Sequence, residues 1–198
     1  NANAGSLQLS LPYRNLGLSG RATYAYDSRY FLEFNFGYNG SERFDKNNRF
    51  GFFPSAGAAW LISNERFWKD IKPIVNNLKF RYSYGLIGND QIGSAYDRFF
   101  YLSEVNMDDG GRGAVFGQEY NTRYNGISIL RYSNPYISWE KSYKQNFALE
   151  IGMWDELSVI AEYFTEKRAN ILMSRASIPN TMGLTATPRA NVGEASGK

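Results

Sequence analysis

Cysteine and histidine are both absent from the 198 residues. Without cysteine, the chain has no disulfides, no thiol nucleophile and no thiolate metal site. Without histidine, zinc sites and acid–base catalysis near neutral pH lose their usual side chain. We therefore expect no enzyme, no metal and no cofactor.

Long apolar runs are missing as well. No stretch of about 18 apolar residues, the length of a membrane helix, occurs in a sequence whose mean hydropathy is −0.47. The 22 basic and 19 acidic residues are intermixed without a basic block, which argues against nucleic acid as a partner. Aromatic residues are abundant, with 15 Tyr and 14 Phe. This combination is typical of β-strands that alternate large apolar and polar side chains.

Such alternation predicts about six antiparallel strands. The clearest covers residues 29–39, where apolar residues alternate with polar ones except at Phe31. At about 3.3 Å per residue and a tilt of about 40°, it rises roughly 25 Å, the height of the apolar band of an outer-membrane barrel. The predicted strands lie near residues 17–26, 29–39, 49–62, 78–87, 138–153 and 157–168.

The predicted connections fall on two rims of unequal character. Residues 27–28, 63–77 and 154–156 connect strands on one rim, and the middle segment holds one helical turn that Pro73 ends. The other rim holds loops near residues 40–48, 88–137 and 169–198, the second with at most short local strands. Bacterial outer-membrane barrels have short periplasmic turns and long extracellular loops. The pattern therefore predicts that the long loops are extracellular.

Alternation alone does not say whether the apolar face meets lipid or a dry protein core. A soluble β-rich binding or glycosidase module is thus an alternative. Aromatic residues near the short-turn rim favour lipid, because they form an interfacial girdle: Tyr24, Tyr26, Tyr30, Trp60, Phe67, Trp68 and Trp154. Charges in the middle of the opposite face suit a watery lumen: Arg21, Glu33, Arg81, Lys144 and Glu150.

Several longer strings are more specific than this periodicity. They are GRATYAYDSRY at 20–30, EFNFGYNGS at 33–41, RFGFFPS at 49–55, LKFRYSYG at 78–85, SWEKS at 138–142 and EYF at 162–164. In this order, over nearly the whole chain, they resemble barrel segments of the SusC/RagA family of TonB-dependent outer-membrane transporters.

This resemblance implies that residues 1–198 are a fragment of a transmembrane β-barrel of roughly 22 strands. The plug and the TonB-contacting segment would lie elsewhere. It also implies import of glycan oligosaccharides or peptides across the bacterial outer membrane, together with a SusD-like surface lipoprotein and the TonB complex. A passive porin or structural barrel is the alternative. We expect both ends to continue into a longer chain, since open sheet edges are not stable in lipid.

Residues 88–137 hold the candidate contacts to cargo or to a lid protein, because binding residues favour loops on rigid scaffolds. They are Tyr96, Phe99, Tyr101, Asp108, Asp109, Arg112, Tyr120 and Tyr124. The alternative is that the aromatic residues pack the loop on itself. Asp108 and Asp109 alone supply too few oxygens for calcium, and the glycines beside them lack the context of a phosphate loop. Glu162 and Glu166 would lie roughly 13 Å apart on a strand, beyond the spacing of a glycosidase pair.

Overall fold

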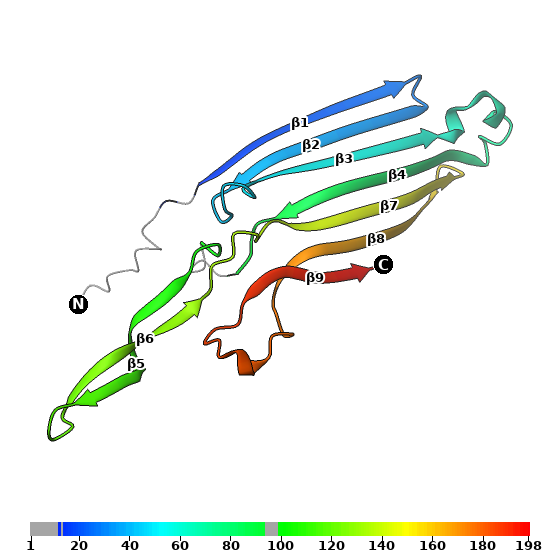
Figure 1. Ribbon diagram of the computed structural model, residues 1–198. Coiled ribbons are helices and arrows are strands. Elements are labelled where there is room, and N and C mark those ends of the chain that lie inside the picture. Colours follow the sequence, from blue (N-terminus) through cyan, green and yellow to red (C-terminus); the bar gives the residue numbers. More distant parts are fainter. Residues whose placement is uncertain (1–11, 13, 94–98) are drawn as a thin grey trace, which may run out of the picture.

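The computed structural model describes residues 12, 14–93 and 99–198. Its main element is a single-layered, seven-stranded sheet of order β1-β2-β3-β4-β7-β8-β9, and β5 and β6 form a separate two-stranded sheet (Figure 1). Every pair of neighbouring strands is antiparallel. The predicted all-β antiparallel fold is confirmed.

The strands are β1 (Asn15–Tyr26), β2 (Tyr30–Ser41), β3 (Phe50–Leu61), β4 (Val75–Asn89), β5 (Glu104–Phe116), β6 (Thr122–Arg131), β7 (Glu140–Met153), β8 (Leu157–Ser174) and β9 (Arg189–Gly197). Short 3-10 helices occur at η1 (Ile62–Asn64), η2 (Arg66–Trp68) and η3 (Asn180–Met182). Within residues 63–77, where one helical turn was predicted before Pro73, the chain forms the 3-10 helix η2, which η1 precedes. Among the described residues, no helix is long and apolar enough to cross a membrane.

The segment predicted as a long loop at residues 88–137 contains the β5–β6 hairpin. Residues 108–113, which belong to that predicted loop, lie inside β5. The register between β5 and β6 shifts between Asn106 and Asp109 and again between Asp109 and Ala114. Each shift interrupts the two-residue period, so the sequence shows little alternation there.

The loop predicted at residues 169–198 is also partly wrong. Strand β8 continues to Ser174, and β9 pairs with it over Arg189–Gly197, so the sheet has seven strands where six were expected. Strand β9 has the sequence RANVGEASG, in which small and polar residues replace the large apolar residues of the other strands. Its pairing with β8 is irregular between Arg168 and Leu172. Both features hide this strand from an analysis based on apolar alternation.

The register of the seven-stranded sheet separates its side chains into two unlike faces. One face, called the apolar face here, carries many exposed large side chains, among them Leu149, which is 37% exposed, and Leu18, which is 64% exposed. Its members include Leu18, Tyr24, Leu32, Phe34, Phe52, Phe80, Tyr84, Phe147, Leu149, Val159 and Tyr163. The described elements leave these side chains uncovered. The other face, called the polar face, carries small, polar and charged residues.

The tight β1–β2 and β7–β8 turns lie at one end of the sheet together with the η1–η2 segment, and this end is called the short-turn end (Figure 1). The β2–β3 loop, the β5–β6 hairpin and the β8–β9 connection lie at the other, the loop end. The β1–β2 turn has Asp27 and Ser28 at φ 50° and 51°, and the β7–β8 turn has Trp154 and Asp155 at φ 54° and 55°. Two successive residues with positive φ are the mark of a type I′ turn, whose twist matches that of the flanking strands. Because none of them is glycine, each carries a steric cost.

Glu65 ties three elements together at this short-turn end. Its carboxylate, 10% exposed, accepts hydrogen bonds from the Tyr30 hydroxyl at 2.6 Å and from Trp60 Nε1 at 3.1 Å. It also pairs with Arg29 at 3.0 Å, and Arg29 in turn contacts Asp27. The hydrogen bond from Tyr30, followed by those from Trp60 and Arg29, lowers the pKa of Glu65 below its ordinary value of 4.5. The Tyr30 ring stacks on Trp60 with centroids 6.3 Å apart.

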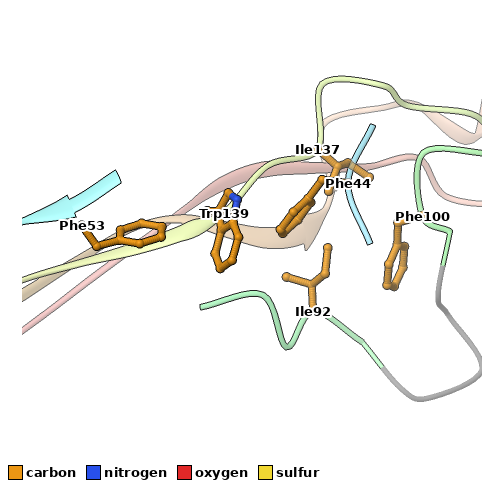
Figure 2. Close-up of a cluster of buried hydrophobic side chains, with 6 residues drawn as sticks. All are labelled: Phe44, Phe53, Ile92, Phe100, Ile137 and Trp139. Carbon is orange, nitrogen blue, oxygen red and sulfur yellow. The ribbon is translucent and has the colours of Figure 1, made fainter. Parts of the chain in front are cut away.

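The buried core of the described chain lies at the opposite end, where the longer segments converge. Figure 2 shows the cluster: Phe44, Phe53, Ile92, Phe100, Ile137 and Trp139. The Trp139 ring lies 5.2 Å from Phe44 and 5.1 Å from Phe53, and its Nε1 donates to the Arg49 carbonyl at 3.2 Å. Phe53 belongs to the polar face, so this loop core covers the polar face and leaves the apolar face free.

Glycine makes room for that core. A Cβ added at Gly51 would lie 2.3 Å from the Phe53 ring, and one added at Gly88 would lie 2.0 Å from it. Any larger residue at either position would displace the ring from Trp139.

Replacing Glu65 by Gln is expected to weaken the short-turn end, because the ion pair with Arg29 is lost. A carboxyl whose folded-state pKa is lowered stabilises the folded state above its ordinary pKa and loses that contribution as pH falls through the lowered pKa. The native protein should therefore melt at a higher temperature than Glu65→Gln at pH 7, and this difference should shrink as the pH falls below 4.5 and disappear below the lowered pKa of Glu65. Heat-dependent mobility in gels, measured across pH, checks this.

The matched control is Glu119→Gln, which removes an exposed carboxylate at the far end of the hairpin. It should leave the melting temperature unchanged. A Glu65→Gln difference that stays constant from pH 7 to pH 3 would contradict the assignment.

Candidate functional site

The polar face is crossed by ion pairs that join neighbouring strands. Arg21 on β1 pairs with Glu33 on β2 at 2.6 Å. Arg81 on β4 joins Glu150 on β7 at 2.7 Å and Glu162 on β8 at 3.0 Å. The register places all the charges predicted to face a lumen on this one face: Arg21, Glu33, Arg81, Lys144 and Glu150.

A second group of charges lies closer to the loop end. The Glu166 carboxylate accepts from the Ser142 hydroxyl at 2.6 Å and pairs with Arg168 at 2.9 Å and Lys144 at 3.9 Å. Glu162 and Glu166 thus bind different basic residues and do not form a catalytic pair. Pairing leaves this face hydrophilic with most of its charges balanced, as a surface in contact with water or a polar partner requires.

A hollow of about 670 Å³ lies on the same face. Small and polar residues line its centre, including Ser55, Gly57, Ser83, Gly85 and Asn146, and the charged residues Glu33, Arg81 and Lys144 flank it. Because these side chains are short, they leave the backbone of the sheet accessible. The hollow is open along one side, so it can receive a polar surface and does not enclose a small molecule.

The β5–β6 hairpin extends from the loop end (Figure 1) and pairs with no other described strand. It has its own cross-strand bonds: the Asn125 side chain donates to Asp108 at 2.6 Å, and Arg123 donates to the Gly110 carbonyl. The Ser128 hydroxyl and the Gly111 N–H, the latter at 2.9 Å, lower the pKa of Asp109 by stabilising its carboxylate. These bonds make the hairpin an ordered arm.

Large apolar side chains on this arm are exposed to solvent. Tyr120 is 74% exposed, Met107 68%, Tyr124 63% and Ile127 57%. The Phe116 ring meets Tyr124 edge-on at 5.8 Å. Such side chains, carried on an ordered hairpin, are suited to contact a partner surface.

The candidate residues of the long segment are spread along the arm and are not gathered in one pocket. Phe99 and Tyr101 pack edge-on at 6.2 Å near its base, Asp108, Asp109 and Arg112 lie on β5, and Tyr120 lies at the far turn with φ 52°. Base and turn are separated by roughly 30–40 Å of strand. Tyr96 lies outside the described residues. Within the described part, no group of three or more acidic side chains is arranged to hold a metal ion.

A second cavity, of about 510 Å³, lies at the base of the arm and was not predicted from the sequence. It is formed by residues from the hairpin base, the end of β8, residues 185–187 and the start of β9, among them Phe100, Arg131 and Arg189. These residues lie far apart along the chain, and β9 itself was not recognised. The one usable signal was the pair of arginines in segments predicted as loops.

Comparisons with known proteins show what the whole arrangement is similar to. No family model matches the sequence. The chain is 33% identical over 180 residues to the TonB-dependent receptor P3 of Formosa agariphila, and 31% identical over 176 residues to the TonB-dependent receptor SusC of Bacteroides thetaiotaomicron. These alignments cover 90% and 88% of this chain and 17% of each relative.

Solved structures give the same result. The RagAB peptide importer matches with a TM-score of 0.72 in its closed-closed state and 0.73 in its open-open state, at 25% identity over 93% of this chain and 18% of that one. The siderophore receptor PirA of Pseudomonas aeruginosa, at 12% identity and a TM-score of 0.54, shares the fold. The chain, which spans 17% of the length of its curated relatives, thus matches one section of the β-barrel of TonB-dependent receptors of the SusC and RagA type.

Proposed function

We propose that the protein containing this section imports glycan oligosaccharides or peptides across the bacterial outer membrane, with energy from TonB and together with a SusD-like surface lipoprotein. This section supplies wall and extracellular loops and has no catalytic role. The observation that carries the proposal is a single-layered sheet with an uncovered apolar face and an ion-paired polar face, in a chain related to SusC and RagA.

The apolar face is suited to lipid. Strands β1, β2 and β3 are each 12 residues long, and 12 residues tilted by about 40° rise roughly 30 Å, enough to cross the hydrocarbon core. Tyr30 and Trp60 stack at the short-turn end of this face, where an interfacial girdle would lie. The outer edges of β1 and β9 then need partner strands, because unpaired backbone groups are costly in lipid.

The polar face is suited to a water-filled interior that receives a plug and passing cargo. Its ion pairs span the middle of the sheet, and the hollow between them presents short side chains. At the loop end, the core around Trp139 holds the loops over this face. Loops held inward narrow the mouth of a barrel, which favours a gated importer over a passive porin.

The β5–β6 arm is suited to contact the surface lipoprotein. It leaves the loop end as an ordered hairpin, and its tyrosines are exposed. Aromatic side chains at exposed positions are typical anchors of protein interfaces. The chemical class of the cargo is supported by the similarity to known transporters and not by the arm itself. RagAB is a peptide importer, whereas the glycan assignment rests on the resemblance to the SusC/RagA family as a whole.

The first prediction concerns the orientation of the sheet in the membrane. This section has no cysteine, so spin labels are attached at Phe34→Cys on the apolar face and, as the matched control, at Asn35→Cys on the polar face. The label at 34 should relax mainly by collision with oxygen dissolved in lipid, and the label at 35 should not. A label at 34 that collides mainly with a water-soluble nickel chelate would rule out the membrane orientation.

A second prediction separates an importer from a passive porin. Removing TonB, or collapsing the proton gradient, should abolish uptake of a cargo that is too large for passive pores. Uptake is measured with radiolabelled cargo in cells. A porin would retain uptake under both treatments, and that outcome would favour the alternative.

A third prediction concerns the arm. The double variant Tyr120→Asn and Tyr124→Ser removes two exposed rings. Asparagine is chosen at position 120 because it adopts the left-handed backbone conformation of this residue readily. The amount of lipoprotein that co-purifies with the receptor should fall roughly tenfold, because aromatic anchors contribute about 1–2 kcal/mol or more each.

The control for the arm is Gln118→Asn, a conservative change at a neighbouring exposed position. It should leave co-purification unchanged. Equal recovery of the lipoprotein with the double variant would exclude the arm as its contact.

A further inference from the structure

The cavity at the base of the arm differs from the rest of the polar face in its charge. Glu104, Arg131 and Arg189 all line it. Arg131 is satisfied: its side chain, 13% exposed, pairs with Glu104 at 3.2 Å and donates to the Leu102 carbonyl at 3.1 Å. Apart from this pair, Arg189 is the one charged residue among the described residues that line the cavity.

Arg189 is exposed and forms no ion pair with any described residue. By contrast, the arginines of the central polar face, Arg21 and Arg81, are each paired with glutamate. The first residue of β9 thus presents a full positive charge inside a cavity of about 510 Å³.

The Phe100 ring positions the guanidinium of Arg189. This ring is 1% exposed, and the guanidinium carbons of Arg131 and Arg189 lie 5.4 Å and 5.6 Å from its centroid. A guanidinium beside an aromatic ring keeps its in-plane N–H groups available as a fork. The buried ring therefore orients Arg189 without satisfying its hydrogen bonds.

Hydroxyl groups complete the lining. Ser174 lies opposite Arg189 in the β8–β9 register, and Thr187 lies just before β9. The Tyr132 hydroxyl accepts from the backbone N–H of Thr185 at 3.3 Å, which leaves its own proton available. A free guanidinium fork with nearby hydroxyl donors is the arrangement that recognises a carboxylate.

We propose that Arg189 and the hydroxyls around it form a subsite for a carboxylate group of the cargo. The proposal rests on the proposed import function and narrows the cargo to a class: oligosaccharides that carry uronic acids, or peptides with a free C-terminal carboxylate. A guanidinium donates to both oxygens of either group, whereas a neutral sugar offers it only hydroxyl oxygens.

The test measures binding to the full-length receptor, purified from its outer membrane, by calorimetry. The probes are a galacturonic acid trimer and its methyl ester, and N-acetyl-pentaalanine and its C-terminal amide. The receptor should bind the charged member of one pair at least tenfold more tightly than the neutral member, and the pair that discriminates identifies the source of the carboxylate. Arg189→Gln should remove this preference. Arg175→Gln, which removes a nearby exposed arginine outside the cavity, should retain it.

Two measurements keep the test decisive if Arg189→Gln fails to assemble. Arg189→Lys keeps the charge without the fork and should reduce the preference by a smaller factor. In the native receptor, raising the salt concentration should weaken binding of the charged probe more than binding of the neutral one. A native receptor without preference for either carboxylate, or an Arg189 variant that keeps the preference, would overturn the proposal.

Failure of this proposal and failure of the import function give different results. If TonB-dependent uptake of the growth substrate is the same in the native receptor and in Arg189→Gln, and neither carboxylate is preferred, the importer stands and the subsite does not. If the charged probe binds through Arg189 but no TonB-dependent uptake occurs, the subsite stands and the importer does not.

Discussion

Continuous antiparallel hydrogen bonding from β1 to β9 is the interaction on which the other features depend. Side chains alternate between faces with a period of two, so a slip of one residue at any strand pair would exchange the two faces beyond it. The register runs without a break through β1, β2 and β3, and the shift between β4 and β7 lies at the end of that pair, between Val75 and Asn77. The other shifts are confined to the outermost pair, β8 and β9, between Arg168 and Leu172. An unbroken apolar face and the ion pairs of the polar face both require that continuity.

The two ends of the sheet hold the register in different ways. At the short-turn end, turns with little freedom join the strands, and Glu65 fixes Arg29, Tyr30 and Trp60 relative to η2. At the loop end, an apolar core around Trp139 holds segments that are distant in sequence. The middle of the wall has no buried core of its own among the described residues. Under the proposed membrane orientation, further strands and lipid would complete it.

Much of this fold could be predicted from the sequence where the period of two is unbroken. Strand β2 is predicted by Tyr30, Leu32 and Phe34, because every second side chain there is large and apolar. Alternation fails where pairing is irregular, as around Asp109, and where a strand lacks large residues, as at β9. The cavity at Arg189 could not be predicted, because it depends on contacts between the hairpin base and a strand that alternation does not reveal. The alternation of apolar and polar residues along each strand predicts the sheet, whereas packing between segments distant in sequence determines the cavity at Arg189.

The seven-stranded sheet and the segments at its loop end can be compared with solved structures of RagAB in two states. The RagAB chain matches this section equally well in closed-closed and open-open states, with TM-scores of 0.72 and 0.73. The matched part of the RagAB chain thus keeps the same fold in both states, and hydrogen bonds along every strand of such a sheet resist deformation. A cargo group held at Arg189, the first residue of β9, would therefore keep a constant position relative to the sheet.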